Sequence, residues 1–297
     1  MSENDRLMEE FLFQSKGVDQ VTGDIPDTTV LPASYIFRIR TKYPTDLFQF
    51  LHTMKKYQVR NCMVCICGQF LRIQCLLRNV AVSAIFGDDT MVFELPEGME
   101  EDRVYGHYDS TTLKSLASIT PRTVREMTFE RNSDGNLQYS VEQLHKEVQD
   151  SIILEMNQSI CIELRTSVYS HMHIIPSSTF KSIVQAMPSV FRVQTLQGNN
   201  PGYLTFIGFG SSCKLQLHVC TDVPMVDASV CILKRDIEIC LAYAKHSLVV
   251  CLGVRTGEPL CCIFPSVLST GGHYHRSNST RTEIYIQPYA EHIQVDE

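Results

Sequence analysis

The chain has 297 residues, of which 44% are hydrophobic and 20% charged, a composition typical of one large or two ordinary globular domains. Its formal net charge of −7 at pH 7 argues against a nucleic-acid binder with a strongly basic surface overall, but it allows a local basic patch on an acidic body. No run of about 18 apolar residues predicts a membrane-spanning helix, and the acidic start lacks the order of a signal peptide.

The predicted elements begin after a polar, acidic leader. Residues 1–33 contain several glycine and proline breakers and predict a flexible segment with one short helix over 6–13. From residue 35 onward, most segments alternate apolar and polar residues between turn-forming residues, which predicts strands. The sequence SDGN at 133–136 is typical of a hairpin turn, and GDD at 87–89 predicts a second turn.

Four segments carry the helical period of apolar residues. They cover 44–57, 110–119, 177–187 and 234–245, and each places apolar side chains at i, i+3 and i+4. The first and third begin roughly 130 residues apart, as do the second and fourth. Both halves therefore run strand, helix, strands, helix, strands. This order predicts an α+β fold made of two tandem copies of one domain.

Cysteine is abundant, with 12 residues, most of them in apolar runs where the thiol packs as a small apolar group. Without a signal peptide, they predict free thiols in a reducing compartment. Cys62, Cys65, Cys67 and Cys75 form a dense group, but a zinc site would need a second close pair at matching spacing. Strand alternation places Cys65 and Cys67 on one face and Cys62 on the other. We therefore expect core packing, with no metal and no cofactor.

Three stretches resemble the sliding DNA clamps, the family of the proliferating cell nuclear antigen (PCNA). IIPSSTFKSIVQAM at 174–187 is similar to the start of the family's second domain, and EIYIQPYAE at 283–291 to its last strand. GQFLRIQCLLRNVAVSAI at 68–85 is similar to the strand–turn–strand after the first helix. LLRN at 76–79 replaces the Asp-Ser-Ser-His turn of cellular clamps, so the resemblance indicates a divergent clamp, of cellular or viral origin.

The resemblance implies two tandem sliding-clamp domains, with antiparallel sheets outside and two helices per domain inside. The leader would be 1–33, the first clamp domain 34–156, the connector 157–167, and the second domain with its acidic tail 168–297. The inner helices would face duplex DNA, and phosphate contacts would hold it without reading its sequence. The candidate DNA-binding residues are Lys55, Lys56, Lys114, Lys181, Lys234, Arg235 and Lys245.

Partner proteins would dock on the outside. In the family, a polymerase or repair enzyme inserts a short turn with aromatic anchors under the connector, where a few buried anchors supply most of the affinity. The candidate partner-binding residues are Leu76, Val80, Ile160, Ile162, Tyr285 and Pro288.

The resemblance implies a non-enzymatic processivity factor that tethers DNA polymerase and other clamp-binding proteins to duplex DNA in the nucleus. Open sheet edges would pair between copies, and three copies would close a ring. Such a ring would need an ATP-driven loader. A subunit of a heterotrimeric DNA-damage checkpoint clamp is the alternative, and some viral factors of this fold stay monomeric or dimeric. A Cys/His metal protein or enzyme is a further alternative, although no catalytic motif is present.

Overall fold

The computed structural model describes residues 38–41, 44–59, 62–67, 70–94, 104–108, 124–131, 137–143, 152–154, 169, 172–196, 202–209, 214–221, 227–270 and 273–289. The predicted leader, the predicted helix over 110–119 and the predicted connector over 157–167 lie outside these residues. The helices are α2 (Pro44–Lys56), α4 (Ser177–Ala186), α5 (Lys234–Ile237) and α6 (Cys240–Tyr243).

Strands make up most of the described chain. In the first half they are β1 (Arg38–Thr41), β2 (Cys62–Cys67), β3 (Phe70–Leu77), β4 (Val80–Gly87), β5 (Met91–Glu94), β6 (Val104–Tyr108), β7 (Val124–Arg131), β8 (Leu137–Gln143) and β9 (Ile152–Leu154). In the second half they are β10 (His173–Pro176), β11 (Val190–Leu196), β12 (Gly202–Phe209), β13 (Lys214–Thr221), β14 (Ala228–Leu233), β15 (Val249–Gly253), β16 (Leu260–Thr270) and β17 (His273–Ile286).

The strands form three sheets, and every strand pair in them is antiparallel. Their orders are β5-β1-β7-β8-β9, β10-β15-β16-β17-β4-β3-β2-β6 and β13-β12-β11-β14. The run β4-β3-β2-β6 of the first half recurs as β13-β12-β11-β14 in the second, and β1-β7-β8-β9 recurs as β10-β15-β16-β17. Apart from β5, which pairs with β1 and has no counterpart among the described strands of the second half, the connectivity of the two halves is the same, in agreement with the repeat that the sequence predicts. The domain boundaries themselves stay a prediction.

One strand pair joins the two halves. β17, from the end of the chain, pairs with β4 from Arg281 opposite Ile85 to Ile286 opposite Val80. The backbone N–H of Gln287 extends this ladder by donating to the carbonyl of Asn79 at 2.8 Å. We call this β17–β4 junction the seam. It makes the eight-stranded sheet continuous from one half to the other.

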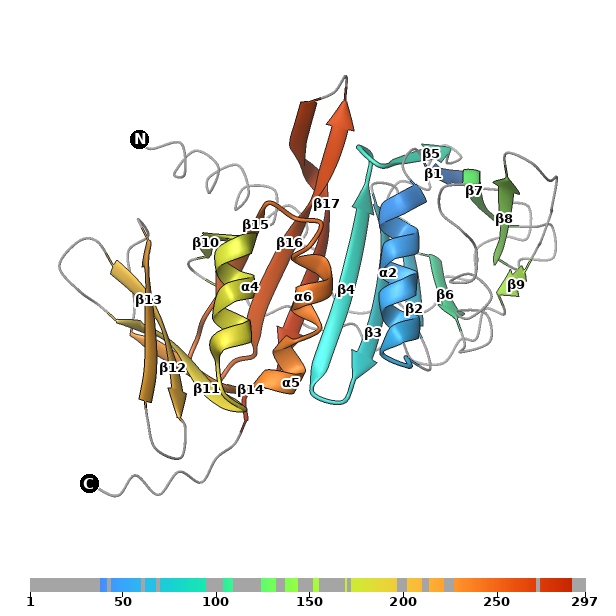
Figure 1. Ribbon diagram of the computed structural model, residues 1–297. Coiled ribbons are helices and arrows are strands. Elements are labelled where there is room, and N and C mark those ends of the chain that lie inside the picture. Colours follow the sequence, from blue (N-terminus) through green and yellow to red (C-terminus); the bar gives the residue numbers. More distant parts are fainter. Residues whose placement is uncertain are drawn as a thin grey trace.

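Figure 1 shows α2, α5 with α6, and α4 side by side on one face of the eight-stranded sheet. Their apolar sides form one core with the sheet, as the helical period predicts: Leu47, Phe50, Leu51 and Met54 of α2 are at most 1% exposed. The rings of Phe180 in α4 and Phe264 in β16 meet edge to face with centroids 6.1 Å apart. The polar sides of these four helices point away from the sheet.

The fourth predicted helix is split in the structure. α5 and α6 are separated by Glu238 and Ile239, whose backbones stay helical but whose carbonyls accept tighter i→i+3 bonds from Leu241 and Ala242. The β-branched Ile237 and Ile239 are both buried, and such residues have low helix propensity. Tertiary packing therefore holds this segment in a helical path that propensity alone does not favour.

Both predicted turns agree with the strand pairing. β7 and β8 pair up to Arg131 opposite Leu137, on either side of the predicted hairpin turn. Asp88, Asp89 and Thr90 form the turn between β4 and β5, so the GDD sequence belongs to this turn. Within the described residues, no helix is long and apolar enough to cross a membrane.

Candidate functional site

The helix face, made of the outward sides of α2, α4, α5 and α6, is the first candidate surface. The segments 44–56, 177–186 and 234–246 contain six lysine or arginine residues and three acidic residues, whereas the whole chain has 26 basic and 33 acidic residues. Lys55, Lys56, Arg235 and Lys245 are exposed, and Lys181 is half-buried. Four helical segments from both halves therefore bring cations together on one side of an acidic chain.

Two of these cations have local contacts that limit their movement. The Lys56 ammonium lies 5.7 Å from the centre of the Tyr57 ring. Arg235 Nε lies 3.5 Å from Asp236 Oδ1, and Asp236 also accepts a hydrogen bond from Asn79 Nδ2 at 3.2 Å. Because the Arg235 side chain is 64% exposed, solvent screens this pair and the guanidinium stays available to an anion. Lys114 lies outside the described residues.

Lys234 has a structural role that the sequence did not predict. Its Nζ donates to the carbonyl oxygens of Gln185 and Met187, both at 2.8 Å. These carbonyls lie at the C-terminal end of α4, where they lack partners within the helix, and a cation there also favours the helix dipole. Because its ammonium caps α4, we leave Lys234 out of the DNA-facing residues proposed below.

A cavity lies at the seam, between α2 and the end of α6. It measures about 30 Å³, and its lining includes Asp46 and Gln49 of α2, His246, Ser266 of β16 and Arg281 of β17. Burial raises the pKa of Asp46 to about 6, against the hydrogen bond with Ser266, and the negative charge of the Asp89 carboxylate raises it further. A carboxyl that titrates near pH 6 therefore lies where the two halves meet.

The opposite face of the eight-stranded sheet carries the second candidate surface. Leu76, Ala81, Tyr285, Cys261 and Gly253 are successive register partners on β3, β4, β17, β16 and β15. They form one apolar row across the seam, which we call the outer row. Leu76 is 59% exposed at one end of the row, whereas Tyr285 is 8% exposed at its middle.

The predicted partner-binding residues divide between this surface and other places. Leu76 and Tyr285 belong to the outer row, and Pro288 follows β17 in a half-buried position. Val80 is 5% exposed and packs in the core on the helix side of the sheet, so we do not include it in the docking surface. Ile160 and Ile162 lie outside the described residues.

Tyr169 covers the far end of the outer row. A Cβ on Gly253 would lie 2.6 Å from Tyr169 Cγ and 2.9 Å from Met172 Sδ, so the ring can lie against the sheet because residue 253 has no side chain. The Tyr169 hydroxyl donates to the carbonyl of Pro259. The row is thus open at Leu76 and covered by an aromatic ring at Gly253.

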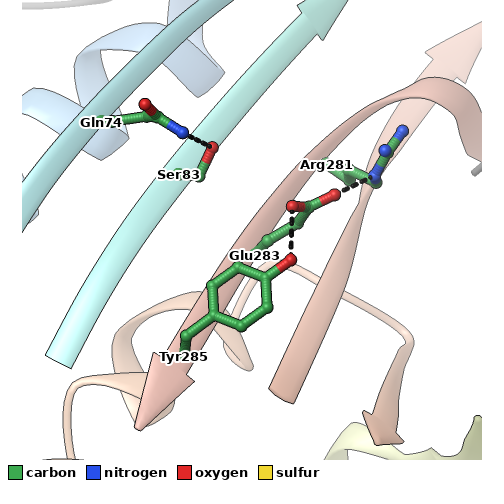
Figure 2. A network of polar contacts seen from close by, with 5 residues as sticks. All are labelled: Gln74, Ser83, Arg281, Glu283 and Tyr285. Atoms are coloured by element: carbon green, nitrogen blue, oxygen red, sulfur yellow. Dashed lines mark hydrogen bonds and ion pairs between the residues drawn. The ribbon is translucent and has the colours of Figure 1, made fainter. Parts of the chain in front are cut away.

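A buried charge network lies beside the outer row (Figure 2). Glu283 accepts hydrogen bonds from Arg281 Nε at 2.7 Å and from the Tyr285 hydroxyl at 3.0 Å. Glu283 faces Ser83 of β4, which faces Gln74 of β3. Glu283 is 4% exposed and Arg281 7%.

The network keeps Glu283 charged although it is buried. Burial by itself would raise the pKa of Glu283, but the positive charges of Arg281 and Arg72 and the hydrogen bonds from Arg281 and Tyr285 outweigh it and lower the pKa. Burial and the nearby Glu283 carboxylate hold the pKa of Tyr285 well above its usual value, so its hydroxyl stays a donor. The seam therefore contains a compensated ion pair.

The dense cysteine group is not arranged as a metal site in the part of the chain that the structure describes. Cys62 and Cys75 are cross-strand partners in the core, whereas Cys65 lies on the other face of β2. Among the described residues, no three His, Cys, Asp or Glu side chains are grouped so that they could hold a metal ion.

Comparison with known proteins rests on structure. No protein-family model matches the chain, and no curated protein sequence matches it. The PCNA structure from Entamoeba histolytica matches with a TM-score of 0.62 and 13% identity, over 86% of this chain and 99% of that one. The PCNA structure from Thermococcus kodakaraensis matches with a TM-score of 0.61 and 12% identity, over 85% of this chain and 100% of that one. The fold is that of PCNA.

The PCNA-like fold confirms the α+β sliding-clamp architecture expected from the resemblance. Sequence reasoning missed several residues of the two surfaces, among them Asp46, Tyr169 and Glu283. An acidic residue directly before an apolar stretch, as in TEIYI at 282–286, was a usable signal for the buried network. Asp46 gave no such signal, because an acidic residue in the first turn of a helix is ordinary.

Proposed function

We propose that this chain is a sliding clamp that holds duplex DNA without sequence specificity and tethers replication and repair enzymes to it. The observation that carries the proposal is the cationic helix face on a chain of net charge −7, within a PCNA-like fold. Lysine and arginine side chains on one surface contact phosphates, and phosphate contacts are independent of sequence.

The helix face has too few cations to bind duplex DNA tightly by phosphate contacts alone. Its cations are the exposed Lys55, Lys56, Arg235 and Lys245 and the half-buried Lys181, and together they would neutralise only a few phosphates. Retention then depends on enclosure of the duplex, and the clamp acts by raising the effective concentration of a tethered polymerase near its template. In this role the chain is a scaffold, without catalytic residues of its own and without a cofactor, and it works in the nucleus.

Assembly of copies would provide the enclosure. Within the chain, β17 of one half pairs with β4 of the other. By the internal repeat, β9 corresponds to β17 and β13 to β4, and each of these is an end strand of its sheet among the described residues. Pairing β13 of one copy with β9 of the next would repeat the seam between copies. Three copies would close a six-unit ring, for which an ATP-driven loader would be needed to admit DNA.

The alternative is a subunit of a heterotrimeric DNA-damage checkpoint clamp. The same two edge strands favour it equally, because they fit related chains as well as copies. Light scattering after size exclusion separates the two: a mass near three times 33.8 kDa supports the homotrimer. A monomer at all concentrations favours a chain that assembles with others.

The outer row is the proposed docking site for the polymerase and other clamp-binding proteins. Leu76 offers an exposed apolar side chain, and Tyr285 and Pro288 lie beside the seam near it. Apolar anchors of a partner would bury Leu76 there. We expect Leu76→Ser to weaken capture of the cognate polymerase without changing the salt dependence of DNA binding, since Leu76 lies on the face opposite the helices.

DNA binding by the helix face is tested by a matched pair of double variants. Lys55→Gln with Lys181→Gln removes two helix-face cations, whereas Arg78→Gln with Arg255→Gln removes two exposed cations in turns. With a fluorescent 30-base-pair duplex, the first double variant should reduce the slope of log K against log salt by about 1.8, and the second should leave it unchanged. Equal slopes for both double variants would reject the helix face as the DNA-binding surface.

A further inference from the structure

His246 occupies the point where the helical segments meet. It follows α6, and its backbone N–H donates to the Tyr243 carbonyl at 2.9 Å. Its side chain is exposed and lines the seam cavity together with Asp46 and Gln49 of α2. The charges of Lys245 beside it and of Lys181 on α4 both act on its imidazole. Residues of α2 and α6 therefore line a cavity with this titratable side chain, and α4, which lies beside α6 (Figure 1), carries a lysine whose charge acts on it.

The electrostatic surroundings of His246 disfavour its charged form when no anion is present. Although the His246 side chain is exposed, its partial desolvation beside the cavity lowers its pKa, and the positive charges of Lys245 and Lys181 lower it further. The other charged groups that line its cavity are Asp46 of α2 and Arg281 of β17. An anion among Lys181, Lys245 and His246 would offset the two lysine charges and accept a hydrogen bond from the imidazolium, so it would favour protonation.

We propose that His246 is a proton-dependent phosphate contact, which acts with Lys181 and Lys245 on the DNA backbone. The inference rests on the proposed function, because it assumes that the helix face meets duplex DNA. Binding and protonation are linked, so a duplex that binds the protonated form more tightly must take up a proton. DNA binding should therefore tighten as the pH falls towards 6, beyond the change that the overall charge of the chain causes.

The test measures binding of the 30-base-pair duplex to the full chain at pH 6.0 and pH 7.5, each over 50–200 mM salt. One extra phosphate contact steepens the slope of log K against log salt by about 0.9. We expect this steepening at pH 6.0 in the wild type and its loss in His246→Gln. Asp46→Asn removes the other group of the cavity that titrates near this pH. This control variant should keep the steepening.

A direct measurement follows the His246 imidazole by NMR, with His246→Gln used to assign its signal. The duplex should raise the pKa of His246, and Lys181→Gln should weaken that rise. If His246→Gln keeps the full pH dependence while the helix-face double variant shows its expected reduced salt slope, only the role of His246 is refuted. If the wild type shows no salt-dependent binding at either pH, the proposed function fails together with this inference. If inorganic phosphate raises the pKa of His246 as much as the duplex does, the cluster is a free-anion site and not a DNA contact.

Discussion

Replacing Glu283 by glutamine tests whether the buried network stabilises the seam. The amide keeps the shape of the side chain but removes the negative charge between two guanidinium groups. Arg281 and Arg72 are buried, with 7% and 9% of their surface exposed, and the substitution removes the negative charge that both of them stabilise. The amide oxygen could still accept from Arg281 Nε, but the amide nitrogen would then need the Tyr285 hydroxyl to change from donor to acceptor.

The expected cost follows from the burial of the pair. Breaking a buried ion pair by removing one partner costs about 3–5 kcal/mol, because the remaining charge is uncompensated. A domain is stable by about 5–15 kcal/mol, so this is a large share of the total. With an unfolding entropy of about 2.1 cal/mol/K per residue, a loss of 4 kcal/mol lowers the Tm of a chain of this length by about 6 °C.

The matched control is Glu94→Gln. Glu94 is ion-paired with Arg40, but their side chains are 42% and 38% exposed. An exposed pair contributes at most about 1 kcal/mol, so the same substitution should have little effect there. Urea unfolding of both variants and the wild type at pH 7 measures the difference. A Glu283→Gln variant that loses no more stability than Glu94→Gln would refute the reasoning.

Three other substitutions probe single features. Asp46→Asn should stabilise the chain by about 3 kcal/mol at pH 7.5, because the raised pKa of Asp46 means that its ionisation lowers the free energy of unfolding. This cost develops between about pH 4 and pH 6, so the gain should disappear below about pH 4, and urea unfolding at a series of pH values measures it. Lys234→Met should cost about 1–2 kcal/mol through the lost cap of α4, yet change the DNA salt slope less than Lys55→Gln does. Gly253→Ala should cost about 1–3 kcal/mol, because its methyl group overlaps Tyr169; an unchanged urea midpoint would show that the ring moves away freely.

Much of the fold could be predicted because its helices are amphipathic. α2 ends one residue before the predicted end, and α4 also ends one residue early. Their spacing and that of the other two predicted helices revealed the repeat, and the short stretches around Ser177 and Tyr285 resembled a known fold. Local periodicity and chain order were sufficient for this level of description.

The arrangement of the surfaces could not be predicted in the same way. Strand alternation says that Leu76 and Val80 are apolar strand residues, but it does not say which neighbouring strand or which sheet face each one meets. The outer row depends on the pairing of β17 with β4, which are almost 200 residues apart in the chain. Lys234 has the sequence features of an exposed lysine, and only the position of α4 shows that its ammonium has carbonyl partners.

The seam also has a consequence for how the chain is made. During synthesis, β4 leaves the ribosome roughly 190 residues before β17, so the edge that pairs with β17 has no native neighbour until β17 has been made. An open, apolar strand edge favours association with other chains, and closing so long a loop slows folding. The nascent chain therefore passes through a vulnerable interval that lasts until β17 has been made, and we expect it to depend on chaperones more than its final stability would suggest.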